Sequence, residues 1–172
     1  MDPLAQRVMN PIIQKAINDQ IREELYSAYL YLSISAYFAS GRLIGIAKWM
    51  QQQAKEEVGH AMRFVDYMNK QGGHVVLDKL KQPPSDFHSV LRAFEASLEH
   101  EKFITSRIHA LKKLAEKEGD SAFGKLLDWF VEEQVEEEET FGEILQQIKA
   151  IKNEKSPAMF ALDQSLGKRE HE

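Results

Sequence analysis

The sequence predicts an all-α fold: four long helices in two antiparallel hairpins, joined by one long crossover and followed by a short fifth helix. Two observations lead to this fold class. Apolar residues recur at helical spacing over four segments of about 30 residues, and a short glycine break separates the two segments of each half. Between the halves lies a longer stretch, residues 72–87, which is rich in glycine and proline. The chain therefore divides into two similar halves.

The four expected long helices are similar in length, and the breaks between them determine how neighbours pair. They cover Pro11 to about Ser40, Leu43 to about Gln71, about His88 to Glu118, and Ser121 to about Lys152. At roughly 1.5 Å per residue, each helix is about 45 Å long, which suits a bundle. The breaks at Gly41 and Gly119 span only a few residues, so each pair must form an antiparallel hairpin.

The stretch between the hairpins sets the topology. Residues 72–87 can span about 50 Å when extended, which is the length of a whole helix. The bundle is therefore expected to have one long crossover instead of an up-down-up-down order. A short fifth helix is expected over about residues 156–167. Ser156 can cap this helix, Pro157 suits its first turn, and Gly167 can end it.

Length and composition restrict the class of protein. A chain of 172 residues suits one domain, expected over residues 1–172 with the bundle at about 11–152. A formal net charge of −5 disfavours a nucleic-acid partner. With no cysteine, any metal must be held by His, Asp or Glu. The first residues lack the apolar stretch of a signal peptide, and no run of 18 apolar residues occurs, so a cytoplasmic protein without a membrane partner is expected.

The two hairpins also repeat at polar positions inside their apolar stripes. Glu24 lies 33 residues before Glu57, and Glu101 lies 33 residues before Gln134. Three pairs share one offset of 77 residues: Glu24 with Glu101, Glu57 with Gln134, and His60 with Glu137. Any one of these polar residues alone would be read as a solvated surface group. Together, and flanked by bulky apolar residues, they indicate a constellation around a pseudo-twofold axis.

This repeat has the ligand pattern of a di-iron site. Glu57 and His60 are three residues apart on one helix, and Gln134 and Glu137 are three apart on another, so each pair faces one way. Di-iron bundles use one Glu from each of two helices and Glu-x-x-His from each of the other two. Carboxylates can bridge two ferrous ions, and an imidazole fixes an open coordination position. We therefore expect Glu24, Glu57, His60 and Glu101 to converge on a buried di-iron site.

Other polar and aromatic residues are weaker candidates. The acidic run from Glu132 to Glu139 is typical of a charged helix face, although Glu133 and Glu136 could join Glu56 in a further carboxylate cluster. Tyr31 lies two turns beyond Glu24 and could reach the metals, or it could be an ordinary core tyrosine. Trp49 and Trp129 are expected to be core or helix-packing residues. The remaining histidines are expected at the surface: His74, His88, His100, His109 and His171.

At these residues the sequence resembles the non-haem bacterial and archaeal ferritins. The matching stretches are NDQIREELYSAYLYLS, KWMQQQAKEEVGHAMRF, FEASLEHEKFIT and LDWFVEEQVEEE. The resemblance implies a ferritin-like bundle of four long helices plus a short fifth, and a homo-oligomeric hollow shell of 24 subunits. It implies iron storage and detoxification, in which dioxygen or peroxide oxidises Fe(II) and Fe(III) is deposited as a mineral.

The resemblance also implies which residues hold the metal. One iron of the ferroxidase centre would be held by Glu24, Glu57 and His60. The second would be held by Glu57, Glu101 and Glu137, with Gln134 close by and Tyr31 as an adjacent redox-active tyrosine. A third iron position maps to Glu56, Glu133, Glu136 and Glu137. All of these positions match the family's pattern.

Departures from related proteins refine the expectation. Bacterioferritins carry a haem-ligating Met where this chain has Val58 and Gly59, so no haem is expected. They keep a second His at the place of Glu137, so the two metal sites should be unequal. Animal ferritins line a threefold channel with acidic residues at the places of Gly124 and Leu127, which leaves the iron entry route open.

Three alternatives remain at this point. A di-iron enzyme acting on an organic substrate or peroxide would share the ligands but form a small oligomer, and no cysteine-rich electron-transfer segment is present. A DNA-protecting mini-ferritin would need a basic arm, whereas residues 1–14 hold a single cation, Arg7. A purely structural bundle would have to bury its carboxylates at a high cost.

Overall fold

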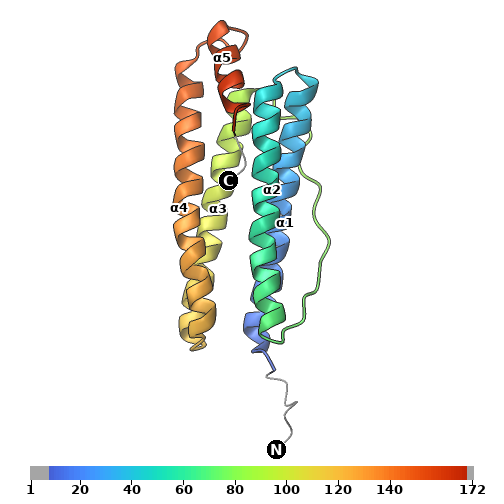
Figure 1. The fold of residues 1–172 in the computed structure, drawn as a ribbon, viewed down its shortest axis with the longest axis vertical. Coiled ribbons are helices and arrows are strands. Elements are labelled where there is room, and N and C mark those ends of the chain that lie inside the picture. The colour runs from blue at the N-terminus through green and yellow to red at the C-terminus, as the bar shows by residue number, and fades with distance from the viewer. Residues whose placement is uncertain (1–7, 170–172) are drawn as a thin grey trace, which may run out of the picture.

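The computed structural model describes residues 8–169 and forms a long bundle of four helices capped at one end by a fifth (Figure 1). The helices are α1 (Pro11–Ser40), α2 (Ile44–Lys70), α3 (Val90–Lys117), α4 (Ser121–Ala150) and α5 (Pro157–Leu166). The predicted all-α fold class is confirmed, and every helix lies within a few residues of its expected range. Arg7 and His171, which entered the predictions above, lie outside the described residues.

The helix ends follow their capping residues. The third helix begins at Val90 instead of His88, because the Ser89 side chain accepts a hydrogen bond from the backbone nitrogen of Arg92, 3.0 Å away. α5 has Pro157 in its first turn and ends before Gly167, as expected. Ser156 occupies the N-cap position of α5, but its side chain makes no capping hydrogen bond.

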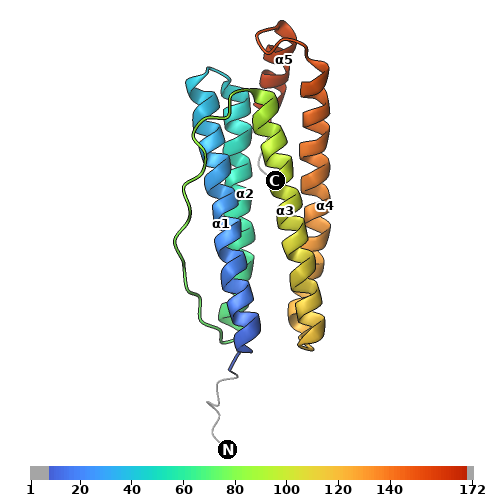
Figure 2. The same ribbon diagram turned by 180° about the vertical axis from the view of Figure 1, so that it is seen from behind.

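The crossover runs along the outside of α1 for most of the length of that helix (Figure 2). Polar side chains of α1 hold its backbone: the Asn18 side chain donates to the carbonyl of His74 and accepts from the nitrogen of Val76, both at 3.0 Å. Farther along, the Ser33 hydroxyl donates to the carbonyl of Pro84 at 2.6 Å. The predicted topology of two hairpins joined by one long crossover is therefore present.

Apolar side chains fill the bundle in two separate clusters, one toward each end. One cluster includes Trp49, Phe94 and Phe141 and extends up to α5, and the other includes Phe64 and Phe130. The polar residues of the predicted centre lie in the layer between these clusters. Trp49 is buried as expected, whereas Trp129 is only partly buried at the side of its cluster. Among the described residues, no helix is long and apolar enough to cross a membrane.

α5 folds back onto the first turn of α2 and caps that helix. Leu43, at the N-cap of α2, has no side chain that can accept a hydrogen bond, and the carboxylate of Asp163 takes this role by accepting from the backbone nitrogen of Ile46 at 2.8 Å. Gly45 makes the close approach possible, since a Cβ there would lie 1.7 Å from the carbonyl oxygen of Asp163. α5 is thereby fixed against α2.

This contact predicts opposite effects for two glycine substitutions. Gly45→Ala should push α5 away from α2 and destabilise the protein by about 1–3 kcal/mol, because a backbone atom blocks the new methyl group. The matched control is Gly142→Ala, whose Cβ would meet no atom within 4 Å and should stabilise α4 by about 0.5–1 kcal/mol. Thermal unfolding and limited proteolysis of residues 151–156 measure both effects. Equal unfolding midpoints and cleavage rates for the two variants would contradict the proposed docking of α5.

Candidate metal centre

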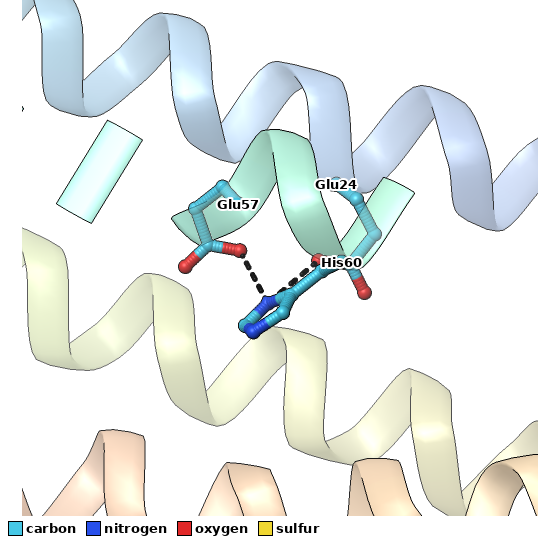
Figure 3. Close-up of side chains that lie close together, drawn as sticks. All are labelled: Glu24, Glu57 and His60. Atoms are coloured by element: carbon cyan, nitrogen blue, oxygen red, sulfur yellow. Dashed lines mark hydrogen bonds and ion pairs between the residues drawn. The ribbon is translucent and has the colours of Figure 1, made fainter. Parts of the chain in front are cut away.

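Each of the four long helices sends at least one polar side chain into the middle of the bundle. Glu24 comes from α1, Glu57 and His60 from α2, Glu101 from α3 and Glu137 from α4, and none is more than 5% exposed. The three-residue spacing turns Glu57 and His60 to the same side of α2, toward Glu24 on the neighbouring helix (Figure 3). The predicted convergence of Glu24, Glu57, His60 and Glu101 is therefore present, and Glu137 joins them.

The side chains form two overlapping sets that could each hold a metal ion. Glu24, Glu57 and His60 make the first set, and Glu57, Glu101 and Glu137 make the second. Within each set, one potential ligand atom per residue lies within 4.8 Å of the others. Glu57 belongs to both sets, so its carboxylate could be shared by two neighbouring ions. The donors are oxygen and imidazole nitrogen, which suit a first-row divalent metal such as iron.

His60 is oriented by carboxylates on both of its ring nitrogens. Its Nδ1 lies 3.0 Å from Oε2 of Glu57 and 3.9 Å from Oε2 of Glu24 (Figure 3). Its Nε2 lies 3.2 Å from Oε1 of Glu133. The ring also packs edge-on against Trp129 and Phe130. If Nδ1 binds a metal, Glu133 becomes the outer carboxylate of a carboxylate–histidine–metal arrangement, which fixes the tautomer and the ring.

Amide and phenol groups donate to the remaining carboxylates. The Tyr31 hydroxyl and the Gln134 amide nitrogen, the latter at 3.0 Å, both donate to Glu101. Tyr31 thus contacts a residue of the centre, which agrees with the first of the two interpretations given for it above. Gln134 faces Glu101 with the nitrogen of its amide, an atom that donates a hydrogen bond and does not bind a metal. It therefore supports a ligand in this arrangement, and a direct contact of Gln134 with metal stays a prediction.

Two glutamines that donate hydrogen bonds to the proposed ligands were not predicted from the sequence. Gln20 donates to Oε1 of Glu24 at 2.9 Å, and Gln53 donates to Oε1 of Glu57 at 3.3 Å and to Oε2 of Glu137 at 2.6 Å. Both glutamines are fully buried. Each lies one turn before a ligand, and they are 33 residues apart, like Glu24 and Glu57. The repeat that identified the carboxylates could therefore have identified these glutamines as well.

One buried carboxylate oxygen of the centre has no hydrogen-bond donor and could bind a cation. Oε2 of Glu24 has no hydrogen-bond partner, although the Glu24 side chain is completely buried. Leaving such an atom unpaired costs roughly 1–3 kcal/mol, and more for a charged group. The atom points into the first set, where a bound cation would satisfy it. The residues present therefore fit a metal ion on this side of the centre.

The centre holds protons at neutral pH. Burial raises the pKa of Glu24, Glu57 and Glu101, and burial together with the charge of Glu101 raises the pKa of Glu137 to about 8. Burial by itself would lower the pKa of His60, but the neighbouring Glu57 and Glu133 outweigh it and raise that pKa to about 12. Several carboxylates cannot all be ionised side by side in a dry site, so protons neutralise part of their negative charge when no cation is bound.

The predicted third carboxylate cluster is only partly assembled. Glu133 lies with His60 and Glu137 in a third group of possible ligands, and the hydrogen bond from His60 lowers the pKa of Glu133. Glu56 is exposed and binds Arg169, whose Nη2 lies 2.7 Å from Oε1 of Glu56. Glu136 is exposed. A third iron position that uses all four carboxylates stays a prediction.

One histidine was placed wrongly from the sequence. His100 is partly buried, with its Nε2 2.7 Å from the Ser27 hydroxyl and its ring edge-on to Tyr26 and Tyr31. Burial and the nearby Lys81 lower its pKa to about 4. The expectation of a surface position failed because α1 and the crossover cover this side of α3. The other described histidines are exposed as expected: His74, His88 and His109.

Comparison with known proteins links this geometry to one family. A family model described as a ferritin-like domain matches residues 14–151. A bacterial non-heme ferritin from Bacteroides fragilis is 40% identical over 157 residues, covering 91% of this chain and 97% of the relative. One from Campylobacter jejuni is 38% identical over 154 residues, covering 90% and 92%. A crystal structure described as an open pore ferritin from Archaeoglobus fulgidus superposes with a TM-score of 0.92 at 42% identity, covering 94% and 99%.

The protonation of the centre predicts that divalent metal binding expels protons. Glu137 and the imidazolium of His60 must lose their protons to act as ligands, because their pKa values are raised to about 8 and about 12, and the pKa of Glu57 is raised as well. At pH 7 we expect a release of about one proton or more per ion bound. Affinity should fall as the pH is lowered from 8 to 6, because protons then compete more strongly for these carboxylates. Calorimetric titration with Zn²⁺, repeated in two buffers of different ionisation enthalpy, counts the protons. Identical heats in the two buffers would contradict the prediction.

Proposed function

This chain belongs to the ferritin family, and from that premise we propose that it stores iron by oxidising Fe(II) at the centre between its four long helices. The observation that carries the proposal is the pair of buried ligand sets that share Glu57. A structural bundle would gain nothing from a layer of carboxylates with raised pKa values and an unpaired buried oxygen. Fe(III) would then leave the centre as mineral inside a hollow shell of about 24 subunits.

In the proposed reaction, iron is the substrate and the side chains hold and neutralise it. Glu24, Glu57 and His60 would bind one Fe(II), and Glu57, Glu101 and Glu137 would bind the other. Two Fe(II) ions supply the two electrons that reduce dioxygen to peroxide, and two protons are taken up with them. Carboxylates favour Fe(III) over Fe(II) because they are hard, negatively charged ligands. Proximity of the two ions, imposed by Glu57, allows both electrons to be delivered together.

The proposal assigns different strengths to the two iron positions. The first set contains an imidazole held by Glu133, whereas the second set contains only carboxylates. A position without imidazole should hold Fe(II) less firmly, which suits iron that passes through the centre. Tyr31 lies against the second set through its hydrogen bond to Glu101, and we propose it as the adjacent redox-active residue.

The alternatives fit the observations less well. In mini-ferritins that protect DNA, the metal site lies between subunits, whereas all ligands proposed here come from one chain and one bundle. A small oligomeric di-iron enzyme would share the ligands, and it would retain its two irons as a cofactor. Particle size and iron content distinguish that enzyme from a storage protein.

Removal of a proposed ligand should abolish rapid iron oxidation. Glu57→Ala removes the bridge between both sets, and His60→Ala removes the only imidazole among the proposed ligands. Each variant should slow the oxidation of Fe(II) in air-saturated buffer by at least about 10- to 100-fold, the range seen when even an outer partner of a metal site is lost. Stopped-flow absorbance of Fe(III) measures the rate. Glu139→Ala, an exposed carboxylate of α4, is the control and should react like the parent. Parental rates in the two ligand variants would refute the assignment.

The assembled particle provides the second test of storage. A chain of 19.8 kDa in a shell of 24 copies gives a particle of about 475 kDa. After exposure to Fe(II) and air, this particle should contain many more iron atoms per chain than its ligand sets can hold. Light scattering on the native protein gives the mass, and elemental analysis gives the iron per chain. A dimer that retains two irons per chain would exclude the storage function.

A further inference from the structure

Two arginines stand behind the buried glutamines that donate to the metal ligands. Nε of Arg107, on α3, donates to Oε1 of Gln20 at 2.9 Å, and Nη1 of Arg169 donates to Oε1 of Gln53 at 3.1 Å. Gln20 in turn donates a hydrogen bond to Glu24. Gln53 donates hydrogen bonds to Glu57 and Glu137. The two metal sets therefore have the same outer support: a guanidinium, then an amide, then a carboxylate.

An arginine fixes which way such a glutamine faces. A guanidinium can only donate hydrogen bonds, so the amide oxygen of the glutamine must turn toward it. The NH₂ group then points to the opposite side, toward the carboxylates. Rotating the Gln53 amide by half a turn would bring its NH₂ against the guanidinium of Arg169 and its oxygen against the carboxylates of Glu57 and Glu137. Arg169 thus determines that Gln53 stabilises these ligands and does not repel them.

Arg169 reaches the centre from the far end of the chain, just beyond α5. Its guanidinium lies over the ring of Trp49, 4.6 Å from the centroid, and contacts Gln53 and Glu56. These three partners are spaced by four and three residues on α2, so they form one stripe along that helix. The docking of α5 supports this reach, since Gly167 passes so close to Gly45 that a Cβ on Gly167 would lie 2.9 Å from the Cα of Gly45.

We propose that Arg169 is a positioning residue of the metal centre, through which the C-terminal end of the chain sets the iron affinity of the Glu57–Glu101–Glu137 set. This inference rests on the proposed function. Arg169 acts through Gln53 on Glu57 and Glu137, and it also engages Glu56. Arg107 has the equivalent place behind Glu24 and acts on the first set. Because Glu57 belongs to both sets, Arg169 acts selectively on the second set through the shorter hydrogen bond of Gln53 to Glu137, whereas Arg107 acts on the first set through Glu24.

The experiment compares Arg169→Ala with Arg107→Ala in the assembled protein. Anaerobic calorimetric titration with Fe(II) resolves two binding steps, and stopped-flow oxidation gives kcat and KM for Fe(II). Arg169→Ala should weaken the weaker step by roughly 10-fold, the lower end of the effect of an outer partner, and raise KM by a similar factor. Arg107→Ala should weaken the stronger step instead. Arg169→Lys, which cannot reach Gln53 and Glu56 with one planar fork, should be intermediate.

Matched controls separate positioning from folding. Lys168→Ala alters the exposed neighbour of Arg169 and should behave like the parent. Thermal unfolding of Arg169→Ala should stay within a few degrees of the parent while its Fe(II) affinity falls. The double variant Arg169→Ala/Gln53→Ala should bind Fe(II) no more weakly than Gln53→Ala alone, because Arg169 acts through Gln53.

Two results would overturn the inference. One is parental Fe(II) affinity and KM in Arg169→Ala, and the other is full additivity in the double variant. These failures are distinct from failure of the proposed function, which would appear as a parent protein that neither oxidises Fe(II) nor accumulates iron in the same assays.

Discussion

Four carboxylates and one imidazole are buried together in the middle of the bundle, and the rest of the structure depends on how their charge is compensated. Ionised carboxylates are costly in a dry interior unless they are paired, hydrogen-bonded or bound to metal. The protein uses all three means: protons held at raised pKa values, amide and phenol donors from neighbouring helices, and ligand sets open to cations. In the proposed function, iron replaces these protons.

The fold withstands this polar layer because apolar clusters lie on both sides of it. The stacked rings of Phe64 and Phe130 fill one side, and the packed rings of Trp49, Phe94 and Phe141 fill the other. Long helices are needed to provide both clusters and the layer between them, and the crossover brings the hairpins together in the order that faces all four helices inward. α5 extends one cluster and, through Asp163, caps the exposed start of α2.

Much of this arrangement could be predicted from the sequence, because helical periodicity acts over short spacings and the internal repeat relates equivalent positions of the two hairpins. Glu57 and His60 face one way on any helix, and the 77-residue offset relates them to Gln134 and Glu137. The length of residues 72–87 decided the topology. Contacts between distant segments could not be predicted in this way. No spacing relates Arg169 to Gln53, or Asp163 to Ile46, since both contacts depend on how α5 folds back. The partial burial of His100 likewise depends on the path of the crossover.

The internal repeat is imperfect at the metal centre, because Gln134 and Glu137 stand at the places equivalent to Glu57 and His60. The hydrogen bonds around each ligand set therefore differ. The first set has an imidazole, which can carry a positive charge in the empty site and bind a metal in the filled one. The second set lacks that group, and Tyr31, Gln134 and Gln53 donate to its carboxylates. Phenol and amide donors orient these carboxylates but are not metal ligands themselves. The second set is thus supported by hydrogen bonds but lacks the imidazole of the first set, so we expect it to hold Fe(II) more weakly. A centre that must release its product repeatedly needs this difference, because an ion held equally by imidazole on both sides would remain as a cofactor.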